Sequence, residues 1–285
     1  MKVGVIGLGL IGGSLALDLR ALGHWVWGIS RRERTCHTAL DRGIIDAYYQ
    51  LGESLPQDTD VVIICTPIEQ IIPSLSLLVK YLSTQTIVTD VGSVKAPIVE
   101  AGQQLWHRFI GSHPMAGNTN SGIESVQKGL FTDRPCAVVP HPVGQINDQI
   151  SALWRSVGME VYYCDSTEHD RAVAWISHLP VIVSASLNLA CNRESSARVK
   201  ILGEKLASSG FADTSRVGGG NPQLGRMMAQ LNRVALLSAL DHYQEVLSSL
   251  RQTIEDEAWE QLEDRLKQAQ EVRQTYIKSG MIAPK

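Results

Sequence analysis

The chain has 285 residues, of which 44% are hydrophobic and 19% charged, and its formal net charge is -3 at pH 7. This length allows one large domain or two ordinary ones, and the composition is typical of a globular protein with a normal core. The near-balanced charge argues against a nucleic-acid-binding surface, and the apolar stretches are too short or too interrupted to predict a membrane span.

The cysteines and the N-terminus indicate the compartment. The five cysteines are scattered, odd in number and without a CxxC pair, which favours reduced thiols in a cytoplasmic protein. The sequence MKVGVIG enters a strand at once, so we expect neither a signal peptide nor a transit segment.

The first half of the chain alternates continuous apolar runs with segments of helical length. We expect strands at 2–7, 25–29, 61–65, 86–91 and 108–112. Helices are expected at 13–23 and 68–82, and two further strands at 135–140 and 159–164 flank a helix near 145–156. Continuous apolar strands separated by helices predict a parallel sheet in a doubly wound α/β domain.

The second half has a different pattern. After about residue 166 strand-like runs disappear, and the remaining segments carry helical spacing. We therefore predict two domains, an α/β domain over 1–165 and an all-α domain over 166–285.

The segment GLGLIGGS, residues 7–14, predicts a dinucleotide site because it follows the first strand and opens a helix. Gly7 allows a tight turn, Gly9 lets the backbone approach a pyrophosphate, and Gly12 allows close packing of helix on strand. The helix N-terminus presents free N–H groups to the phosphates. The residues between the glycines share this expected site: Leu8, Leu10 and Ile11. A glycine-rich turn without a ligand is the alternative.

The end of the second strand, WVWGISRRER, indicates which dinucleotide binds. An acidic residue normally stands about here and bonds the ribose 2′-hydroxyl, whereas this chain has Ser30, Arg31 and Arg32. Serine removes the repulsion of a 2′-phosphate, and an arginine can meet it with charge-assisted hydrogen bonds. The pattern predicts NADP rather than NAD. The alternative is that both arginines are surface residues opening the next helix.

Two further strand ends should line the same crevice. Cys65, Thr66 and Pro67 follow the third of the expected strands, and the sequence DVGS, residues 90–93, follows the next. Ser93 can present its hydroxyl beside the nicotinamide, although a serine in this position is also an ordinary helix cap.

GSHPMAG, residues 111–117, contains the histidine that we expect at the mouth of the crevice. Pro114 disfavours helix at His113 and so predicts an extended turn that holds the imidazole. Histidine titrates near working pH and suits the base that an alcohol dehydrogenase needs. A structural histidine is the alternative. A metal site is not expected, because HExxH is absent and no two histidines lie within four residues of each other.

GLGLIGGS, DVGSVK, GSHPMAG and HDRAVAWISHLP occur in that order, and with them the chain resembles the prephenate/arogenate dehydrogenase family of tyrosine biosynthesis. The resemblance covers nearly the whole chain. It implies a Rossmann-type dinucleotide-binding domain joined to a helical domain that forms a homodimer. It also implies oxidative decarboxylation of a cyclohexadienol.

Carried over by motif, the family's catalytic histidine falls on His113 and its serine on Ser93, which would position that histidine and the nicotinamide. The substrate-carboxylate arginine falls on Arg216 in GFADTSR, with an exposed loop arginine as the alternative. His178 of SHLP is expected in the substrate pocket, or else is a core histidine. Ser112 and Gly117, within GSHPMAG, complete the expected substrate site.

Two departures from the family pattern concern the substrate's side chain. Members that prefer prephenate often read SHLPH, whereas this chain has Val181, and VGGGNPQLG lacks the aromatic residue that often follows Asn-Pro. Together with NADP these departures favour arogenate over prephenate. Trp259 and Asp241 are further pocket residues to consider.

Two other functions remain open at this point. A β-hydroxyacid dehydrogenase or an imine reductase could share the two-domain plan, and the former would need a catalytic lysine; Lys200 and Lys205 lie on a charged, solvated helix. A non-catalytic, NADP-binding regulator is the second alternative.

Overall fold

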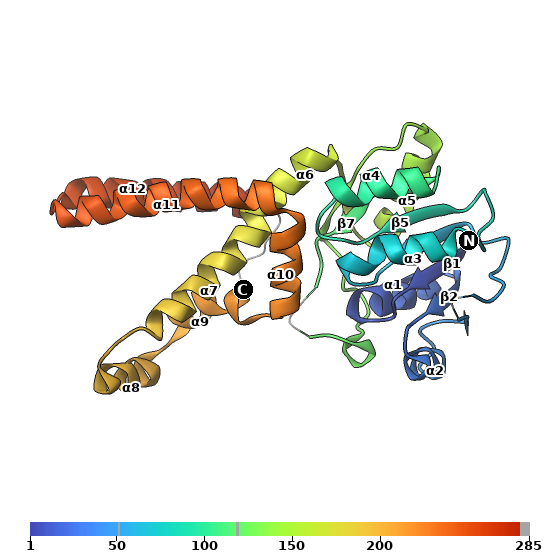
Figure 1. Cartoon of the computed structure of the whole chain (residues 1–285), viewed down its shortest axis with the longest axis horizontal. Coiled ribbons are helices and arrows are strands. Elements are labelled where there is room, and N and C mark those ends of the chain that lie inside the picture. Colours follow the sequence, from blue (N-terminus) through green and yellow to red (C-terminus); the bar gives the residue numbers. More distant parts are fainter. Residues whose placement is uncertain (51, 118–119, 280–285) are drawn as a thin grey trace.

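The computed structural model describes residues 1–50, 52–117 and 120–279. It has an N-terminal part in which helices cover a parallel sheet, followed by an entirely helical part (Figure 1). The fold class expected from the sequence is confirmed.

The main sheet is all-parallel and doubly wound. Its strands are β1 (Lys2–Ile6), β2 (Trp25–Ile29), β3 (Ala47–Tyr48), β4 (Val61–Ile64), β5 (Ile87–Asp90) and β6 (Phe109–Ile110). They lie in the order β3-β2-β1-β4-β5-β6. The direction of winding reverses between β1 and β4, and ligands of such sheets bind at the carboxyl ends of the strands at this point.

The helices of this part are α1 (Leu10–Ala21), α2 (Glu33–Asp41), α3 (Ile71–Leu78), α4 (Ala96–Leu105) and α5 (Gly144–Ser156), with short 3-10 turns at Ile68–Gln70 and Ile123–Ser125. The helix expected over 68–82 is therefore shorter. Pro73 lies in the first turn of α3, where its missing N–H leaves no bond unmade, and residues 68–70 form a separate turn before it.

A second sheet carries the GSHPMAG segment. It consists of β7 (Ser112–Pro114), β8 (Pro135–Val138) and β9 (Glu160–Tyr163), with β7 antiparallel to β8 and β8 parallel to β9. The single strand expected at 108–112 is thus two strands, separated at Gly111. A Cβ on Gly111 would lie 2.4 Å from Val99 Cγ2, so only glycine fits there. His113 lies within β7 rather than in a turn after a strand, which corrects the expectation.

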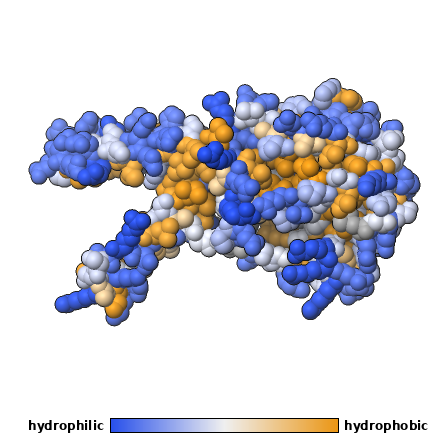
Figure 2. Space-filling view, viewed as in Figure 1, coloured by the Kyte–Doolittle hydropathy of each residue, from blue (hydrophilic) through white to orange (hydrophobic). Residues whose placement is uncertain are grey.

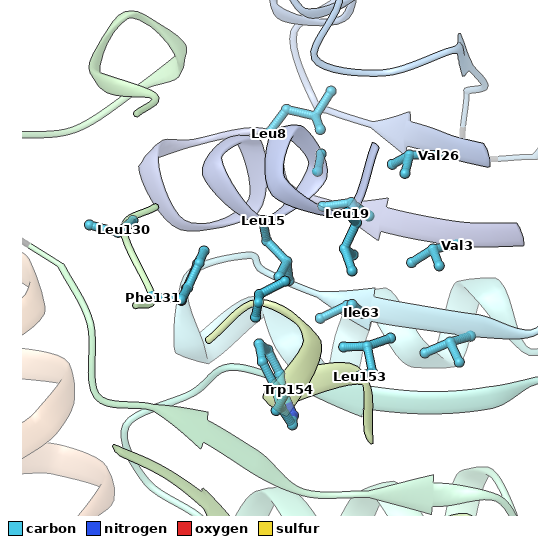
Figure 3. Packing of buried hydrophobic residues seen from close by; sticks show 14 of the residues in the cluster. Val3, Leu8, Leu15, Leu19, Val26, Ile63, Leu130, Phe131, Leu153 and Trp154 are labelled. Carbon is cyan, nitrogen blue, oxygen red and sulfur yellow. The ribbon is translucent and has the colours of Figure 1, made fainter. Parts of the chain in front are cut away.

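Packing against the sheet fixes the position of α1. Its Leu15 and Leu19 are fully buried against strand residues, as Figure 3 shows. The other buried residues that the figure labels are Val3, Leu8, Val26, Ile63, Leu130, Phe131, Leu153 and Trp154. The N-terminus of α1 is consequently held rigidly beside the end of β1.

The helical part begins with α6 (Ser166–Val173), a π-helical turn (Ala174–His178) and α7 (Leu179–Cys191). It continues with α8 (Ala197–Leu206), α9 (Ser209–Ser215), a 3-10 turn (Val217–Gly219), α10 (Pro222–Leu231), α11 (Arg233–Glu255) and α12 (Trp259–Ser279). α11 and α12 form one long arm, and α7 with α8 and α9 forms a second (Figure 1).

The helix Ser166–Cys191 runs without a break for 26 residues, and by length and composition alone it could cross a membrane. The sequence predicted an interrupted stretch here. The π turn directly before Leu179 accommodates Pro180, which has no N–H to donate, so the helix continues. Core helices of soluble proteins pass the same test of length and composition.

The helical part has a small core for its size. Its buried cluster consists of Ala174, Leu179, Leu236 and Ala239. Many large apolar residues on its helices are exposed, for example Leu189, Leu202, Val246 and Leu247. Figure 2 shows apolar surface gathered where the two arms meet, whereas the visible face of the α11 and α12 arm is mostly hydrophilic. Such contiguous exposed apolar surface marks an interaction site.

Candidate functional site

The glycine-rich turn has the geometry that a dinucleotide requires. Gly7 has φ +101° and a Cβ there would lie 2.7 Å from the carbonyl oxygen of Cys65. A Cβ on Gly12 would lie 2.0 Å from the carbonyl oxygen of Gly7, so α1 packs as closely as glycine allows. Around a Cβ on Gly9 no heavy atom lies within 4 Å, and this residue caps α1. The turn is therefore closely packed at Gly7 and Gly12 and leaves open space at Gly9.

The first N–H groups of α1 have no partners within the helix and face this open side. The side chains of Leu8 and Leu10 are buried in the core, so these residues can offer a ligand only their backbone. Ile11 is half-buried. The arrangement fits a pyrophosphate at the helix N-terminus.

The chain after β2 stands beside this turn, since the N–H of Gly7 donates to the carbonyl oxygen of Ile29 at 2.8 Å. Ser30 is half-buried, whereas Arg31 and Arg32 are both exposed. Arg32 is also the N-cap residue of α2. The two arginines thus follow β2, the strand next to β1, which the glycine turn follows. They also stand at the start of α2, as the alternative interpretation describes.

The segment after β4 forms the other side of the turn. A Cβ on Gly7 would lie 3.0 Å from the backbone nitrogen of Thr66, and the Thr66 hydroxyl is buried without a hydrogen-bond partner in the described parts of the chain. An unpaired buried hydroxyl is costly unless a ligand completes it. Burial raises the pKa of the Cys65 thiol, which keeps it protonated. Pro67 is exposed. The donors present around this turn fit a bound dinucleotide.

His113 lies in β7, the strand that precedes a loop approaching α1. The loop that follows it reaches Gly117, where a Cβ would lie 3.7 Å from Ile11 Cδ1 in the first turn of α1. His113 itself is buried, and its Nδ1 lies 2.9 Å from Nε2 of His169 on α6. The histidine therefore sits where the glycine turn, the second sheet and the helical part meet.

A buried ion pair fixes the strand that carries His113. Lys95 is fully buried and pairs with Asp90 at the end of β5. Its Nζ also donates to the carbonyl oxygen of Ser112 at 2.7 Å, and the N–H of Ser112 donates to Asp90 at 3.2 Å. Burial lowers the pKa of Lys95 and the Asp90 carboxylate opposes that shift. β7 is thereby tied to the end of β5.

The two serines have different surroundings. Ser112 is fully buried and its hydroxyl bonds Thr89 at 2.8 Å, so it supports β7 and does not face a substrate. Ser93 is half-buried before α4, and within the described residues no hydrogen bond joins it to His113, whose ring nitrogen meets His169. Direct positioning of His113 by Ser93 is not seen in the structure.

The environment of His113 keeps its imidazole neutral. Burial, followed by the charges of His169, Lys95 and His178, holds the pKa of His113 well below its usual value. At neutral pH the ring therefore has a free lone pair, the state that a general base requires.

His178 has a buried ring N–H without a hydrogen-bond partner in the described parts of the chain. It lies on the π turn, and the Asn232 side-chain amide donates to its Nδ1 at 3.1 Å. Nδ1 is therefore the acceptor and Nε2 carries the hydrogen, yet Nε2 is buried and has no partner in the described parts of the chain. Burial lowers the pKa of His178 to about 4. A neutral N–H is thus available to a ligand oxygen.

Arg216 lies farther away, exposed between α9 and the following 3-10 turn. Its loop is held against α7, because the Ser184 hydroxyl donates to Thr214 and accepts from Gly218, each at 2.8 Å. Ser184 follows His178 by six residues, roughly 9 Å along a helix. No interaction in the described chain joins Arg216 to His113.

The remaining candidates are spread along the arms. Val181 is half-buried near Gly225. Asp241 is exposed on α11, and Trp259 is 57% exposed at the start of α12. Lys200 on α8 bonds the side chain of Asn192 at the end of α7, and α8 has no buried residues, which gives no support to a catalytic lysine.

Sequence reasoning missed four residues that surround His113. Asp90 and Lys95 belong to DVGSVK, and His169 and Asp170 begin HDRAVAWISHLP, so both quoted segments contained the signal. The histidines pair across 56 positions, which no local spacing rule detects. Within the described residues no group of three or more His, Cys, Asp or Glu side chains is arranged to hold a metal ion.

Comparisons with known proteins agree with this geometry. The family model for the nucleotide-binding domain of prephenate dehydrogenase matches residues 15–165, and the model for its dimerization domain matches residues 165–268. A prephenate dehydrogenase of Bacillus subtilis is 31% identical, covering 94% of this chain and 74% of its own length. A cyclohexadienyl dehydrogenase of Zymomonas mobilis is 28% identical, covering 95% and 94%.

Solved structures are similar over almost the whole chain. A Synechocystis arogenate dehydrogenase has a TM-score of 0.87 and 44% identity, covering 97% of this chain and 100% of that one. A prephenate dehydrogenase from A. aeolicus, in complex with hydroxyphenyl propionate and NAD+, has a TM-score of 0.88 and 27% identity, covering 96% and 98%.

Proposed function

Because the chain belongs to the prephenate dehydrogenase family and is a dehydrogenase of that kind, we propose that it converts L-arogenate to L-tyrosine by oxidative decarboxylation, with NADP as the hydride acceptor. The observation that carries the proposal is the position of His113. It is a buried, neutral imidazole in β7, which is tied to the carboxyl end of β5 in the doubly wound sheet and is followed by a loop that approaches the first turn of α1.

Each step of the proposed reaction is assigned to His113 or to the cofactor. When bound at the glycine turn, NADP would supply the hydride acceptor for the carbinol carbon of the substrate. His113 removes the proton of the hydroxyl on that carbon, a contribution of about 10²–10⁴-fold for a positioned base. Loss of the ring carboxylate as CO2 leaves its electron pair in the ring, and the ring becomes aromatic. His113 then returns the proton to the phenolic oxygen, so the chain releases no net proton and needs no metal.

The preference for NADP rests on Ser30, Arg31 and Arg32. The three residues follow β2 beside the glycine turn, and none of them is acidic. A charge-assisted hydrogen bond to a 2′-phosphate is worth about 1.5–3 kcal/mol, or roughly ten- to a hundred-fold in affinity. We propose that at least one of the two arginines makes this bond, and that Cys65, Thr66, Pro67 and Ser93 line the rest of the cofactor site.

The substrate site is proposed on the helical side of His113. The free N–H of His178 suits a substrate oxygen, and Arg216 suits a carboxylate. Gly117 lies at the edge of the same crevice. The choice of arogenate rests on Val181 in place of histidine and is supported by the similarity to a Synechocystis arogenate dehydrogenase. Prephenate is the alternative, since relatives with that name are also similar.

We further propose that residues 1–165 and 166–285 act as two domains and that the second forms a homodimer. Support comes from the match to a dimerization-domain model and from the exposed apolar residues on α7, α8, α11 and α12. A second copy would cover them. The five cysteines are all free thiols, which supports a cytoplasmic location.

Initial rates of reduced-cofactor formation test the choice of both ligands. Arogenate and prephenate are each assayed with NADP and with NAD. The proposal expects turnover with arogenate and NADP to exceed every other pairing in kcat/KM by at least about tenfold, the lower value expected of one charged contact. Equal or faster turnover with prephenate would refute the assignment from Val181, and a preference for NAD would refute the assignment from Ser30 to Arg32.

A further inference from the structure

A chain of hydrogen bonds runs from His113 into the helical part. Nδ1 of His113 lies 2.9 Å from Nε2 of His169, and Nδ1 of His169 lies 2.8 Å from Oδ1 of Asp170. All three side chains are buried, with exposed fractions of 7%, 3% and 6%. These bonds are sheltered from water and therefore hold their geometry.

Backbone donors hold both side-chain oxygens of Asp170. Oδ1 accepts the N–H of Lys95 at 2.7 Å and Oδ2 accepts the N–H of Ala96 at 2.9 Å. These two residues begin α4, so the carboxylate also meets the positive end of the helix dipole. A carboxylate with such donors only accepts hydrogen bonds. The bond to His169 therefore requires the hydrogen to be on Nδ1 of His169.

This arrangement determines which nitrogen of His113 is free. A neutral His169 with hydrogen on Nδ1 has a lone pair on Nε2, so Nδ1 of His113 must donate to it. Nε2 of His113 then carries the lone pair. The opposite tautomer of His113 would place two lone pairs against each other at 2.9 Å.

We propose that His169 and Asp170 are positioning residues that fix the tautomer and the orientation of His113, so that Nε2 is the basic atom. The proposal rests on the proposed role of His113 as the base. When Nε2 takes the substrate proton, the positive ring still donates through Nδ1, and Asp170 partly balances its charge through His169.

The hydrogen bonds that hold Asp170 join the two parts of the protein. Asp170 belongs to α6, and the backbone groups that hold it belong to the N-terminus of α4 in the α/β part. Asn232 also donates to the carbonyl oxygen of Asp170 at 2.7 Å. His113 consequently becomes a base of defined tautomer only where the two parts are docked together.

The first test reads the tautomer directly and does not depend on activity. The full chain is prepared with ¹⁵N-labelled histidine, and long-range ¹H–¹⁵N correlation spectra identify the protonated nitrogen of each ring. The signals of His113 are assigned by their loss in His113→Gln. We expect hydrogen on Nδ1 and a bare Nε2 in the wild-type protein at neutral pH. Hydrogen on Nε2 would overturn the proposal while leaving the proposed reaction intact.

The second test compares two substitutions of His169 with a control. In His169→Gln the amide nitrogen can donate to Asp170 and the oxygen can accept from His113, whereas His169→Phe fills the space without either bond. We expect His169→Phe to lose the Nδ1–H tautomer and to lower kcat by at least about 10²-fold with KM changed by less than about threefold. His169→Gln should keep the tautomer and recover most of that loss.

Arg226→Ala provides the matched control. Arg226 on α10 bonds Glu69 of the α/β part at 2.7 Å, so its removal breaks another contact between the two parts without touching Asp170. The tautomer of His113 and kcat should stay unchanged in this variant. Equal kcat for His169→Phe and His169→Gln would overturn the proposal. If His169→Phe does not fold, the wild-type spectrum and the tautomer of His113 in His169→Gln still test the proposal.

Discussion

Asp170 and Lys95 lie 75 positions apart in the sequence, and the Asp170 carboxylate accepts the backbone N–H of Lys95 at 2.7 Å. A side chain of the helical part thus caps a helix of the α/β part, one residue from where His169 meets His113. The contact joins the two parts at the point where the proposed chemistry occurs.

His113→Asn should abolish most turnover without loss of cofactor affinity. Because the base is lost and the glycine turn is untouched, we expect kcat/KM to fall by about 10²–10⁴-fold. Steady-state rates and fluorescence titration with NADPH check the two parts of this expectation. His107→Asn, an exposed histidine outside the cluster, is the control. Retained turnover in His113→Asn would favour the non-catalytic regulator or another base.

The cofactor preference should reverse when the charge after β2 is changed. Ser30→Asp introduces a carboxylate that would accept a hydrogen bond from the ribose 2′-hydroxyl of NAD and would repel a 2′-phosphate. We expect KM for NADP to rise by roughly ten- to a hundred-fold, with that for NAD falling.

Arg31→Ala and Arg32→Ala, made singly, identify which arginine binds the phosphate. The exposed Arg155 on α5 offers a control in Arg155→Ala. A KM for NADP that is unchanged in both arginine variants would remove the support for NADP.

The acid limb of kcat/KM should lie below pH 6.5. His113 must be neutral to accept a proton, and its pKa is lowered by burial and by electrostatic interactions with His169, Lys95 and His178. A lowered pKa keeps the base form present to lower pH, so activity is lost only as pH falls through that lower value. The kcat/KM profile checks this, and a limb centred above 6.5 contradicts the assigned environment.

Removal of one partner from the buried ion pair should destabilise the protein. Lys95→Met leaves the Asp90 carboxylate buried and uncompensated, and we expect the free energy of unfolding to fall by about 3–5 kcal/mol. Urea unfolding followed by fluorescence measures this loss. The double variant Lys95→Met with Asp90→Asn should recover part of the stability, since no charge then remains. A loss under about 1 kcal/mol in Lys95→Met would show that water reaches the pair.

The exposed apolar surface of the helical part predicts how the dimer can be split. Val246→Lys and Leu247→Lys place cations on α11 in the proposed interface, and sedimentation velocity should show dissociation at micromolar concentration. Leu77→Lys, an equally exposed residue on α3, should leave the assembly unchanged. A wild-type chain that sediments as a monomer would refute the proposed homodimer.

The elements predicted from the sequence are mostly those whose signals are local. Gly7 and Gly12 indicate a tight turn, and continuous apolar residues indicate buried strands such as β4. β3 was missed because it has only two residues. β7 was merged with β6 because a single glycine separates them.

The supporting residues of the site could not be found in this way. His169, Asp170 and Lys95 gain their roles from contacts made between distant segments, and Lys95 looks like a surface residue until the ion pair buries it. The Ser112 hydroxyl bonds that of Thr89, a contact that the segment GSHPMAG does not reveal. Local patterns predict where in the chain a site lies, whereas packing determines which side chains line that site.

The most direct test of the central claim measures reduced cofactor and released CO2 together, with arogenate and NADP as substrates and with His113→Asn in parallel. The account predicts equal molar amounts of NADPH, CO2 and tyrosine from the wild-type enzyme, and about 10²–10⁴-fold slower formation of all three in the variant. Reduced cofactor without CO2, or a rate that His113→Asn leaves unchanged, would contradict oxidative decarboxylation by a His113 base.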